Sequence, residues 1–393
     1  MSGPRLRALS VPAGVAALSI LGDLRGALDG SGPALAPHGP HASPPPIPAD
    51  VDQLPGHLAL AIGTSGTTGR PKLAMLTSVA LLASANATHD RLGGSGRWLL
   101  AMPAHHIAGI QVLVRSLVAE TPPACMDLSG GFTTAGFARA TEAMNDGAAA
   151  DRAYTALVPT QLVRLLASVD GRQALTRYAA VLVGGAAAPS RLLAHAKEVG
   201  VRVVTTYGMS ETAGGCVYDG HSLDVSLVQL EDDGRIRLGG ATLAQGYLGE
   251  PALSAEAFVV DPSSRRWFRT DDVGHVDDLG ALRVDGRIDD LINTGGLKVV
   301  PRQVEEALTG LEMVAEAVVV GTADPEWGQI VSAALVVTPG SPPPTLHDLR
   351  GQLRGILPDH ALPRRLATLS KLPLRGPGKP DRAAVRRLFG DNG

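Results

Sequence analysis

The segment Gly63 to Lys72 concentrates groups that could bind a negatively charged ligand. Its ten residues, GTSGTTGRPK, include three glycines, four hydroxyl side chains and two cations. Glycines leave backbone N–H groups open to close approach, and rows of such groups form concavities that bind anions. The order Gly69-Arg70-Pro71-Lys72 differs from a Walker A loop, which needs Gly-Lys-Ser/Thr in succession. The segment therefore predicts a phosphate-binding loop of another kind, in place of a plain hairpin turn between two strands.

Alternating strands and helices are expected to position this loop. Buried strands are expected at residues 57–62, 97–102, 153–158, 179–185 and 201–208, and helices at 110–120, 159–169 and 189–200. Such alternation predicts a mainly parallel sheet covered by helices, with ligands bound at loops that follow the carboxyl ends of strands. The proline-rich stretch 31–50 is expected to form a surface loop without regular structure.

The pattern of expected secondary structure changes beyond residue 230. Short strands separated by turns come first, and from Asp289 onward helices and strands follow in an order that predicts a compact α+β unit of about a hundred residues. We place the boundary in the segment 285–296. The chain is thus expected to form an N-terminal domain at residues 1–287 and a C-terminal domain at residues 288–393.

Composition argues against several classes of protein. The chain has 393 residues, a net charge of −3 and only 3% aromatic residues, which gives no reason to expect a nucleic-acid partner. Cys125 and Cys216 are too few for a disulfide framework, so we expect a reducing compartment. No stretch approaches the roughly 20 apolar residues that span a bilayer, and no secretory signal is evident. A cytoplasmic protein is expected.

The glycine-rich segment resembles the phosphate-loop signature of the adenylate-forming superfamily of acyl-CoA synthetases, luciferases and adenylation domains. Other stretches resemble the remaining motifs of that superfamily in the same order: MPAHHIAG (102–109), TTYGMSETAGG (205–215), WFRTDDVG (267–274), DGRIDDLINTGGLKV (285–299) and LPLRGPGKPDR (372–382). The resemblance implies an α/β fold. Its large N-terminal domain, shortened at the N-terminus, would contain layered, mainly parallel sheets and helices that bind ATP and the acyl substrate. A small mobile α+β C-terminal lid would carry a catalytic lysine.

The resemblance also implies ATP-dependent activation of a carboxylate as an acyl-adenylate. Charge builds on the phosphates in that step, so donors and cations placed there favour it. Lys379 would bridge the α-phosphate and the attacking carboxylate, Glu211 would hold Mg²⁺, and Ser210 would bond the α-phosphate. The implied nucleotide-binding set is Thr64, Ser65, Gly66, Thr67, Thr68, Gly69, Lys72, Gly184, Gly185, Ala186, Tyr207, Gly208, Met209, Asp272 and Arg287.

The ribose-binding stretch departs from the pattern of the superfamily. Relatives usually read Thr-Gly-Asp, whereas this chain reads Thr270-Asp271-Asp272. Spacing assigns the ribose hydroxyls to Asp272, with Asp271 as the alternative, and Arg287 would assist. Each residue also has a purely structural interpretation. An acidic residue can begin a helix, an aspartate can cap a turn, an arginine can pair with a neighbouring carboxylate, and a lysine can be solvated in a loop.

The second half-reaction needs a thiol, which implies CoA as the second substrate. Asp289 matches the hinge position about which the C-terminal domain would swing. Gly295 and Gly296 would let pantetheine pass close to the backbone, and Lys298 could meet the phosphates of CoA.

Several stretches, among them PAHHIAGIQVLVRSL, VPTQL and GGATLAQGY, resemble the o-succinylbenzoate–CoA ligases of menaquinone synthesis. Their substrate is aromatic and carries two carboxylates, one of which must be held unreacted, a task suited to a buried cation. Arg115 follows His106 by about two and a half helical turns and is the candidate. His106, Thr160 and Gln161 could add hydrogen bonds. Arg115 could instead lie on a helix surface, and the two adjacent histidines could be packed loop residues.

Other functions remain open at this point. The chain could be a different aryl- or acyl-CoA ligase, an amino-acid adenylating enzyme serving a carrier protein, or a non-catalytic nucleotide sensor. The expected partners are small molecules, namely o-succinylbenzoate, ATP with Mg²⁺, and CoA. A homo-oligomer is compatible with the sequence.

Overall fold

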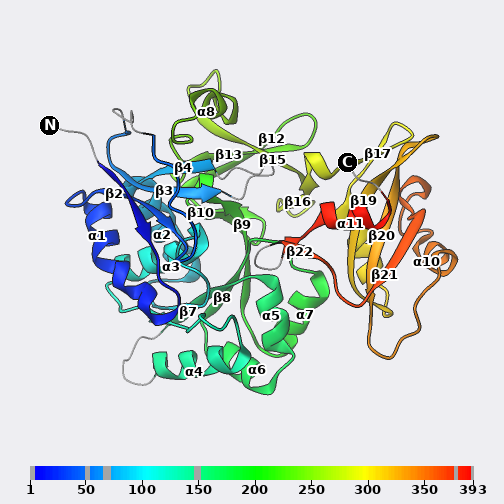
Figure 1. The fold of residues 1–393 in the computed structure, drawn as a ribbon, viewed down its shortest axis with the longest axis horizontal. Coiled ribbons are helices and arrows are strands. Elements are labelled where there is room, and N and C mark those ends of the chain that lie inside the picture. The colour runs from blue at the N-terminus through cyan, green and yellow to red at the C-terminus, as the bar shows by residue number, and fades with distance from the viewer. Residues whose placement is uncertain (1–4, 49–53, 65–71, 146–151, 376–378, 391–393) are drawn as a thin grey trace. The chain divides into compact units, whose positions relative to one another are not determined.

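The computed structural model describes residues 5–48, 54–64, 72–145, 152–375 and 379–390 (Figure 1). The chain separates into two compact units. Unit 1 comprises Met1–Gln229 and Arg237–Thr270, and unit 2 comprises Leu230–Ile236 and Asp271–Gly393. In the described part of the chain, no helix combines the length and the apolar character needed to cross a membrane.

The centre of unit 1 is a seven-stranded sheet in the order β11-β10-β9-β8-β7-β5-β6 (Figure 1). Neighbouring strands from β6 to β9 are parallel, whereas β10 and β11 are antiparallel additions. The sheet confirms the predicted mainly parallel arrangement. Its strands are β5 (Arg97–Leu100), β6 (Ala124–Cys125), β7 (Ala153–Leu157), β8 (Ala180–Val183), β9 (Val203–Met209), β10 (Gly214–Tyr218) and β11 (His221–Ser222).

Helices cover both faces of this sheet, because alternate residues of each strand point to opposite faces. Trp98 and Leu100 belong to one apolar core, while Leu99 between them belongs to another. The first core contains side chains of α2 (Ser78–Leu92) and α3 (Ile107–Val118). The second contains side chains of α4 (Thr134–Asn145), α5 (Pro159–Leu166), α6 (Val169–Leu175) and α7 (Ser190–Glu198). Burial on both faces explains why the strands read as continuous apolar runs.

A four-stranded sheet packs on the other side of α2 and α3, sharing the first core (Figure 1). It consists of β1 (Leu6–Ser10), β2 (Ala34–His38), β3 (Leu58–Thr64) and β4 (Lys72–Thr77), and η1 (Gly14–Ile20) and α1 (Leu21–Asp29) connect β1 to β2.

The strand β2 corrects the expectation that residues 31–50 lack regular structure. Ala34, Leu35 and Ala36 are buried and pair in parallel with β1, so a short apolar run forms a strand despite the surrounding prolines. Pairing with β3 occurs at Leu35, and Pro37 lies beyond it, where its missing N–H costs the sheet little.

A third sheet follows in the order β12-β13-β15-β14, with β16 also paired to β15. The boundary between the units falls at the end of β12 and within β13 and β15. These elements are β12 (Ser226–Leu230), β13 (Arg235–Gly240), β14 (Phe258–Val260), β15 (Arg266–Val276) and β16 (Leu282–Arg287), with α8 (Pro251–Ala257) before β14.

The remainder of unit 2 is an α+β fold, as predicted. The sheet has the order β18-β17-β20-β19, with β21 beside β20, and Val318 and Val319 on β19 belong to different apolar cores. One core includes residues of α9 and α10 and the other includes Val385 of α11. The elements are η3 (Ile288–Asp290), β17 (Ile292–Thr294), β18 (Leu297–Val299), α9 (Pro301–Thr309), β19 (Val314–Asp324), β20 (Gly328–Val337), α10 (Leu346–Leu353), η4 (Asp359–Ala361), β21 (Arg365–Leu369), β22 (Leu374–Arg375), β23 (Lys379–Pro380) and α11 (Arg382–Leu388).

Candidate active site

The predicted phosphate loop connects the antiparallel strands β3 and β4. Thr64 at the end of β3 lies opposite Lys72 at the start of β4, so both ends of the loop are held by a paired hairpin. Lys72 is half-buried, and its Nζ lies 5.3 Å from the centroid of the Tyr247 ring. The other predicted loop residues lie outside the described residues: Ser65, Gly66, Thr67, Thr68 and Gly69.

Two further nucleotide motifs lie at the carboxyl ends of adjacent parallel strands. The segment Gly184 to Ala186 follows β8, and Tyr207 to Met209 ends β9, which pairs with β8 through Val183 and Thr205. Gly208 is required by close packing, because a Cβ there would lie 2.1 Å from the carbonyl oxygen of Gly214. The fold thus brings these motifs together where ligands bind in parallel α/β sheets.

Glu211 and Ser210 lie on the short 3₁₀ turn η2 (Ser210–Thr212), directly after β9. Both are buried, with 7% and 8% of their surface exposed. The turn ends at Ala213, which has a φ of 51° in the left-handed region. The Ala213 carbonyl accepts hydrogen bonds from Ser84 Oγ at 3.1 Å and from Gln111 Nε2 at 2.8 Å. Buried donors on α2 and α3 therefore hold an unusual backbone conformation next to Glu211.

The Glu211 carboxylate is also bonded by a residue that sequence reasoning missed. The hydroxyl of Tyr247 donates to Glu211 Oε1 at 2.9 Å. No group of three or more His, Cys, Asp or Glu side chains that could hold a metal occurs among the described residues. A single buried carboxylate nonetheless fits Mg²⁺, which proteins usually bind through one or two carboxylates together with substrate phosphates and water.

Arg115 lies in the core of unit 1, which excludes the helix-surface interpretation. It is 3% exposed, donates from Nη2 to the Tyr218 hydroxyl at 3.3 Å, and stacks over Trp98 with 5.0 Å between its Cζ and the ring centroid. Its Nε has no hydrogen-bond partner, and no carboxylate among the described residues pairs with it. Burial lowers the pKa of Arg115, because the charged form is desolvated. A buried cation without an anion is costly and suits an anionic ligand.

The other predicted acyl-site residues surround the start of α3 and α5. His106 is exposed at the N-cap of α3, with its ring 4.2 Å from that of His105. Burial, followed by the nearby histidines, lowers the pKa of His105 to about 4. Thr160 is half-buried on α5. The Gln161 amide already bonds backbone at both ends, accepting from Val158 N at 2.9 Å and donating to Ala101 O at 3.0 Å.

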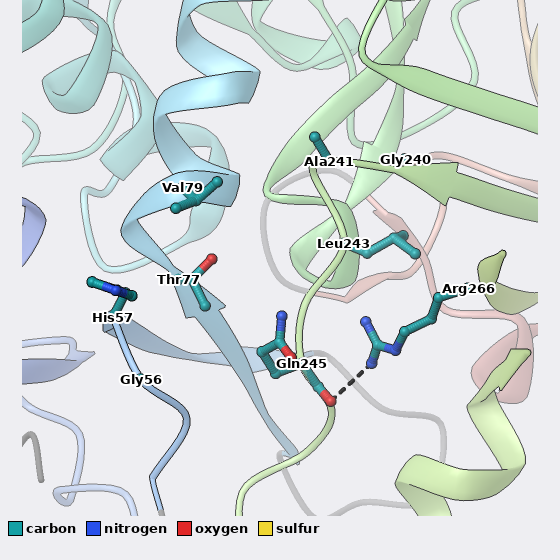
Figure 2. Close-up of a pocket in the computed structure, with 9 residues that line it drawn as sticks. All are labelled: Gly56, His57, Thr77, Val79, Gly240, Ala241, Leu243, Gln245 and Arg266. Atoms are coloured by element: carbon teal, nitrogen blue, oxygen red, sulfur yellow. Dashed lines mark hydrogen bonds between the residues drawn. The ribbon is translucent and has the colours of Figure 1, made fainter. Parts of the chain in front are cut away.

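A pocket of about 410 Å³ lies at the opposite end of the β3–β4 hairpin from Thr64 and Lys72 (Figure 2). Arg266 reaches toward it and donates from Nη2 to the Gln245 carbonyl at 2.8 Å. The pocket contains none of the residues predicted for ATP or acyl binding. Its lining is Gly56, His57, Thr77, Val79, Gly240, Ala241, Leu243, Gln245 and Arg266.

In unit 2, the two candidate ribose aspartates have different surroundings. Asp271 is engaged by Arg235 at 2.8 Å and by Arg287 at 3.1 Å, whereas Arg287 Nη1 lies 4.0 Å from Asp272 Oδ1. Asp272 lies directly opposite Arg287 across the β15–β16 pair. Burial opposes the charge on Arg287, but Asp272, Asp271 and Asp289 outweigh it and raise its pKa.

The predicted hinge and thiol-site residues also lie in unit 2. Asp289, on η3, accepts a hydrogen bond from Arg287 Nη2 at 3.4 Å. Gly295 and Gly296 form the turn between β17 and β18, and a Cβ on Gly295 would lie 2.8 Å from the Trp327 ring. Lys298 is exposed on β18. Lys379 begins β23, opposite Arg375.

The fold and these motifs define an enzyme class. The family model described as "AMP-binding enzyme" matches residues 27–276, and the model described as "AMP-binding enzyme C-terminal domain" matches residues 303–379. The chain belongs to the AMP-binding enzyme family.

Particular members of this family are similar over most or nearly all of the chain. A "Probable 2-succinylbenzoate--CoA ligase" of Mycobacterium tuberculosis is 47% identical over 387 residues, covering 98% of both chains. A 2-succinylbenzoate–CoA ligase of Listeria innocua is 30% identical over 337 residues, covering 82% of this chain and 68% of that relative. The fold matches the o-succinylbenzoate CoA synthetase MenE of Bacillus subtilis, solved with the acyl-adenylate OSB-AMP, at a TM-score of 0.75. That match has 22% identity and covers 98% of this chain and 89% of that one.

Proposed function

We propose that this enzyme is an acid–thiol ligase that joins 2-succinylbenzoate to CoA in menaquinone biosynthesis. The reaction consumes ATP and yields succinylbenzoyl-CoA, AMP and diphosphate through an acyl-adenylate. The observation that carries the proposal is the 47% identity to a probable 2-succinylbenzoate–CoA ligase over 98% of both chains. The buried Glu211 turn beside the two nucleotide motifs agrees with it.

In the first half-reaction, a carboxylate oxygen of the acid attacks the α-phosphate of ATP and diphosphate leaves. The loop from Thr64 to Lys72 would hold the β- and γ-phosphates, Ser210 the α-phosphate, and Tyr207 the adenine. Bound at Glu211, Mg²⁺ would neutralise charge on the phosphates. Lys379 would bring its ammonium group between the two anions that must meet.

Asp272 is our assignment for the ribose hydroxyls. The carboxylate of Asp271 is already engaged by two arginines, whereas Asp272 is mostly buried, with 17% of its side chain exposed. A carboxylate accepts hydrogen bonds from both hydroxyls without needing a donor of its own. Arg287 would keep the strand opposite Asp272 in place through its contacts with Asp271 and Asp289.

Arg115 is our candidate for the second carboxylate of the substrate. Its buried guanidinium has an unbonded Nε and no carboxylate partner in the described part of the chain. A bidentate pair with an arginine would select a diacid over a monoacid. His106 and Thr160 would add hydrogen bonds, and Gln161 would shape the pocket through its backbone contacts.

In the second half-reaction, the sulfur of CoA attacks the acyl carbonyl and AMP leaves. The C-terminal lid, residues 288–393, would turn about Asp289 against the ATP- and acyl-binding domain, residues 1–287. Gly295, Gly296 and Lys298 would then guide CoA. We place the reaction in the cytoplasm, where ATP and CoA are available.

The proposal is tested by measuring CoA-thioester formation with 2-succinylbenzoate, benzoate and fatty acids. We expect a kcat/KM for 2-succinylbenzoate at least about 100-fold above the others, because a site built to bind a second carboxylate leaves a buried charge unpaired when a monoacid binds. Equal rates with several acids would instead favour a general acyl-CoA ligase. Amino-acid-dependent diphosphate exchange would favour an adenylating enzyme.

A further inference from the structure

The segment Ala244 to Leu248 connects two of the nucleotide motifs. It runs along β4, where Gln245 N donates to Met75 O at 2.7 Å and Leu248 N donates to Leu73 O at 2.9 Å. At its start, Ala244 N donates to the backbone carbonyl of Glu211 at 2.8 Å. One segment therefore holds both the strand that begins at Lys72 and the turn that carries Glu211.

Tyr247, in the middle of this segment, contacts side chains of both motifs. Its hydroxyl donates to Glu211 Oε1 at 2.9 Å, and the Lys72 ammonium lies 5.3 Å from its ring centroid. The ring is 5% exposed and packs edge-on against Phe258 at a centroid distance of 5.7 Å. Packing and backbone bonds thus fix the hydroxyl before any ligand binds.

The hydrogen bond restricts how the Glu211 carboxyl group can rotate. A phenol donating to a carboxylate makes a charge-assisted bond, which is stronger than a neutral one. An oxygen that accepts one hydrogen bond retains a lone pair, so the bond is compatible with coordination of a cation. Residues that orient a metal ligand in this way strengthen metal binding without touching the metal.

We propose that Tyr247 is a positioning residue that presents the Glu211 carboxylate to Mg²⁺. Its ring also lies 5.3 Å from the Lys72 ammonium, so one side chain contacts both the metal ligand and the loop lysine. This inference rests on the proposed role of Glu211 in metal binding.

The test compares Tyr247→Phe with the matched variant Tyr178→Phe. Tyr178 is also 5% exposed, and its substitution also removes one buried hydrogen bond, between the hydroxyls of Tyr178 and Thr141 at 2.7 Å. Tyr178 lies in the second apolar core of unit 1, the core that contains side chains of α4 to α7. The readout is the affinity of Mn²⁺ for enzyme saturated with α,β-methylene-ATP, measured by electron paramagnetic resonance. We expect Tyr247→Phe to weaken Mn²⁺ binding about 10-fold, within the range for lost outer partners of metal ligands. Tyr178→Phe should change it less than about 2-fold.

Glu211→Gln separates failure of this inference from failure of the proposed function. Mn²⁺ binding should be abolished or weakened further in Glu211→Gln than in Tyr247→Phe. If Glu211→Gln binds Mn²⁺ as the unmodified enzyme does, the proposed metal role of Glu211 is wrong. If Glu211→Gln loses Mn²⁺ while Tyr247→Phe matches Tyr178→Phe, Tyr247 only packs and the inference is overturned.

Discussion

Arg382 Nε lies 3.2 Å from the carboxylate of Asp290 in unit 2. The same guanidinium contacts Glu305 at 2.7 Å. Burial opposes its charge, but Glu305 and Asp290 outweigh that effect and raise the pKa of Arg382. Arg382 begins α11, just after Lys379, and Asp290 adjoins Asp289. An ion pair therefore links the segment that carries the predicted catalytic lysine to the predicted hinge.

Arg382→Gln should destabilise unit 2 and impair adenylate formation. Removing the guanidinium takes the arginine partner from Glu305 and leaves Asp290 with its longer contact to Arg386, so we expect the free energy of unfolding to fall by about 2 kcal/mol. Adenylate formation, followed as diphosphate release, should fall more than the reaction of preformed adenylate with CoA. Lys379→Ala should show the same preference more strongly. Arg386→Gln is the control, because it removes the other arginine near Asp290, whose contact is longer, at 3.6 Å. Equal loss of both half-reactions would contradict a link to the lysine.

Asp272→Ala should raise the KM for ATP and remove discrimination against 2′-deoxy-ATP. A hydrogen bond from a ribose hydroxyl to a carboxylate is worth about 1.5–3 kcal/mol, so the loss of even one should raise the KM by roughly 10- to 100-fold. Asp271→Ala should retain the preference for ATP, because its carboxylate serves Arg235 and Arg287. Steady-state kinetics with both nucleotides checks the assignment, and the reverse pattern would assign the ribose to Asp271.

Arg115→Met should raise the KM for 2-succinylbenzoate by about 10-fold or more while leaving the KM for ATP unchanged. Methionine preserves much of the volume beside Trp98 and removes a buried charge that has no carboxylate partner among the described residues. The free energy of unfolding should therefore change by less than about 1 kcal/mol. Parallel kinetics and urea unfolding distinguish the two roles, because unchanged KM values with lower stability would make Arg115 a packing residue.

His89 should make the protein less stable in mild acid. It is 4% exposed and accepts a hydrogen bond from Trp98 Nε1 at 3.2 Å. Burial, followed by the charge of Arg115, lowers its pKa from 6.5 to about 4. Between these values the unfolded chain binds more protons than the folded one, so the free energy of unfolding falls as pH drops through this window. Above pH 6.5 the contribution is complete.

His89→Gln should reduce that acid dependence. Urea unfolding at about pH 7.5 and about pH 5 should show a smaller difference in the variant than in the unmodified protein. Part of the dependence should remain, because the pKa of His105 is also lowered to about 4. An identical difference in both proteins would mean that His89 does not contribute to the acid dependence of stability.

Local sequence patterns were sufficient to predict the successive strands and helices and the motifs that lie at strand ends. The apolar runs of β7 and β8 are buried on both faces. Gly208 was expected because TTYGMSETAGG resembles a motif of the superfamily, and close packing against Gly214 requires a glycine there. The contact between Tyr247 and Glu211 could not be predicted, because it depends on a loop that returns along β4.

The burial of polar residues was equally hard to predict from the sequence. Arg115 follows a helical pattern that fits either a surface or a core position, and only the packing of Trp98 and Tyr218 decides. The strand β2 was missed for a related reason. Its prolines outweighed a short apolar run, Ala34 to Ala36, whose strand is stabilised by pairing with β1 and β3.

The acyl-adenylate itself is tested most directly with 2-succinylbenzoate labelled with ¹⁸O in its carboxylates. The attacking carboxylate oxygen becomes the bridge to the α-phosphate and leaves with AMP when CoA attacks the carbonyl. Mass spectrometry of the products should therefore find one ¹⁸O in each AMP and none in diphosphate. Unlabelled AMP, or label in phosphate or diphosphate, would contradict the mechanism.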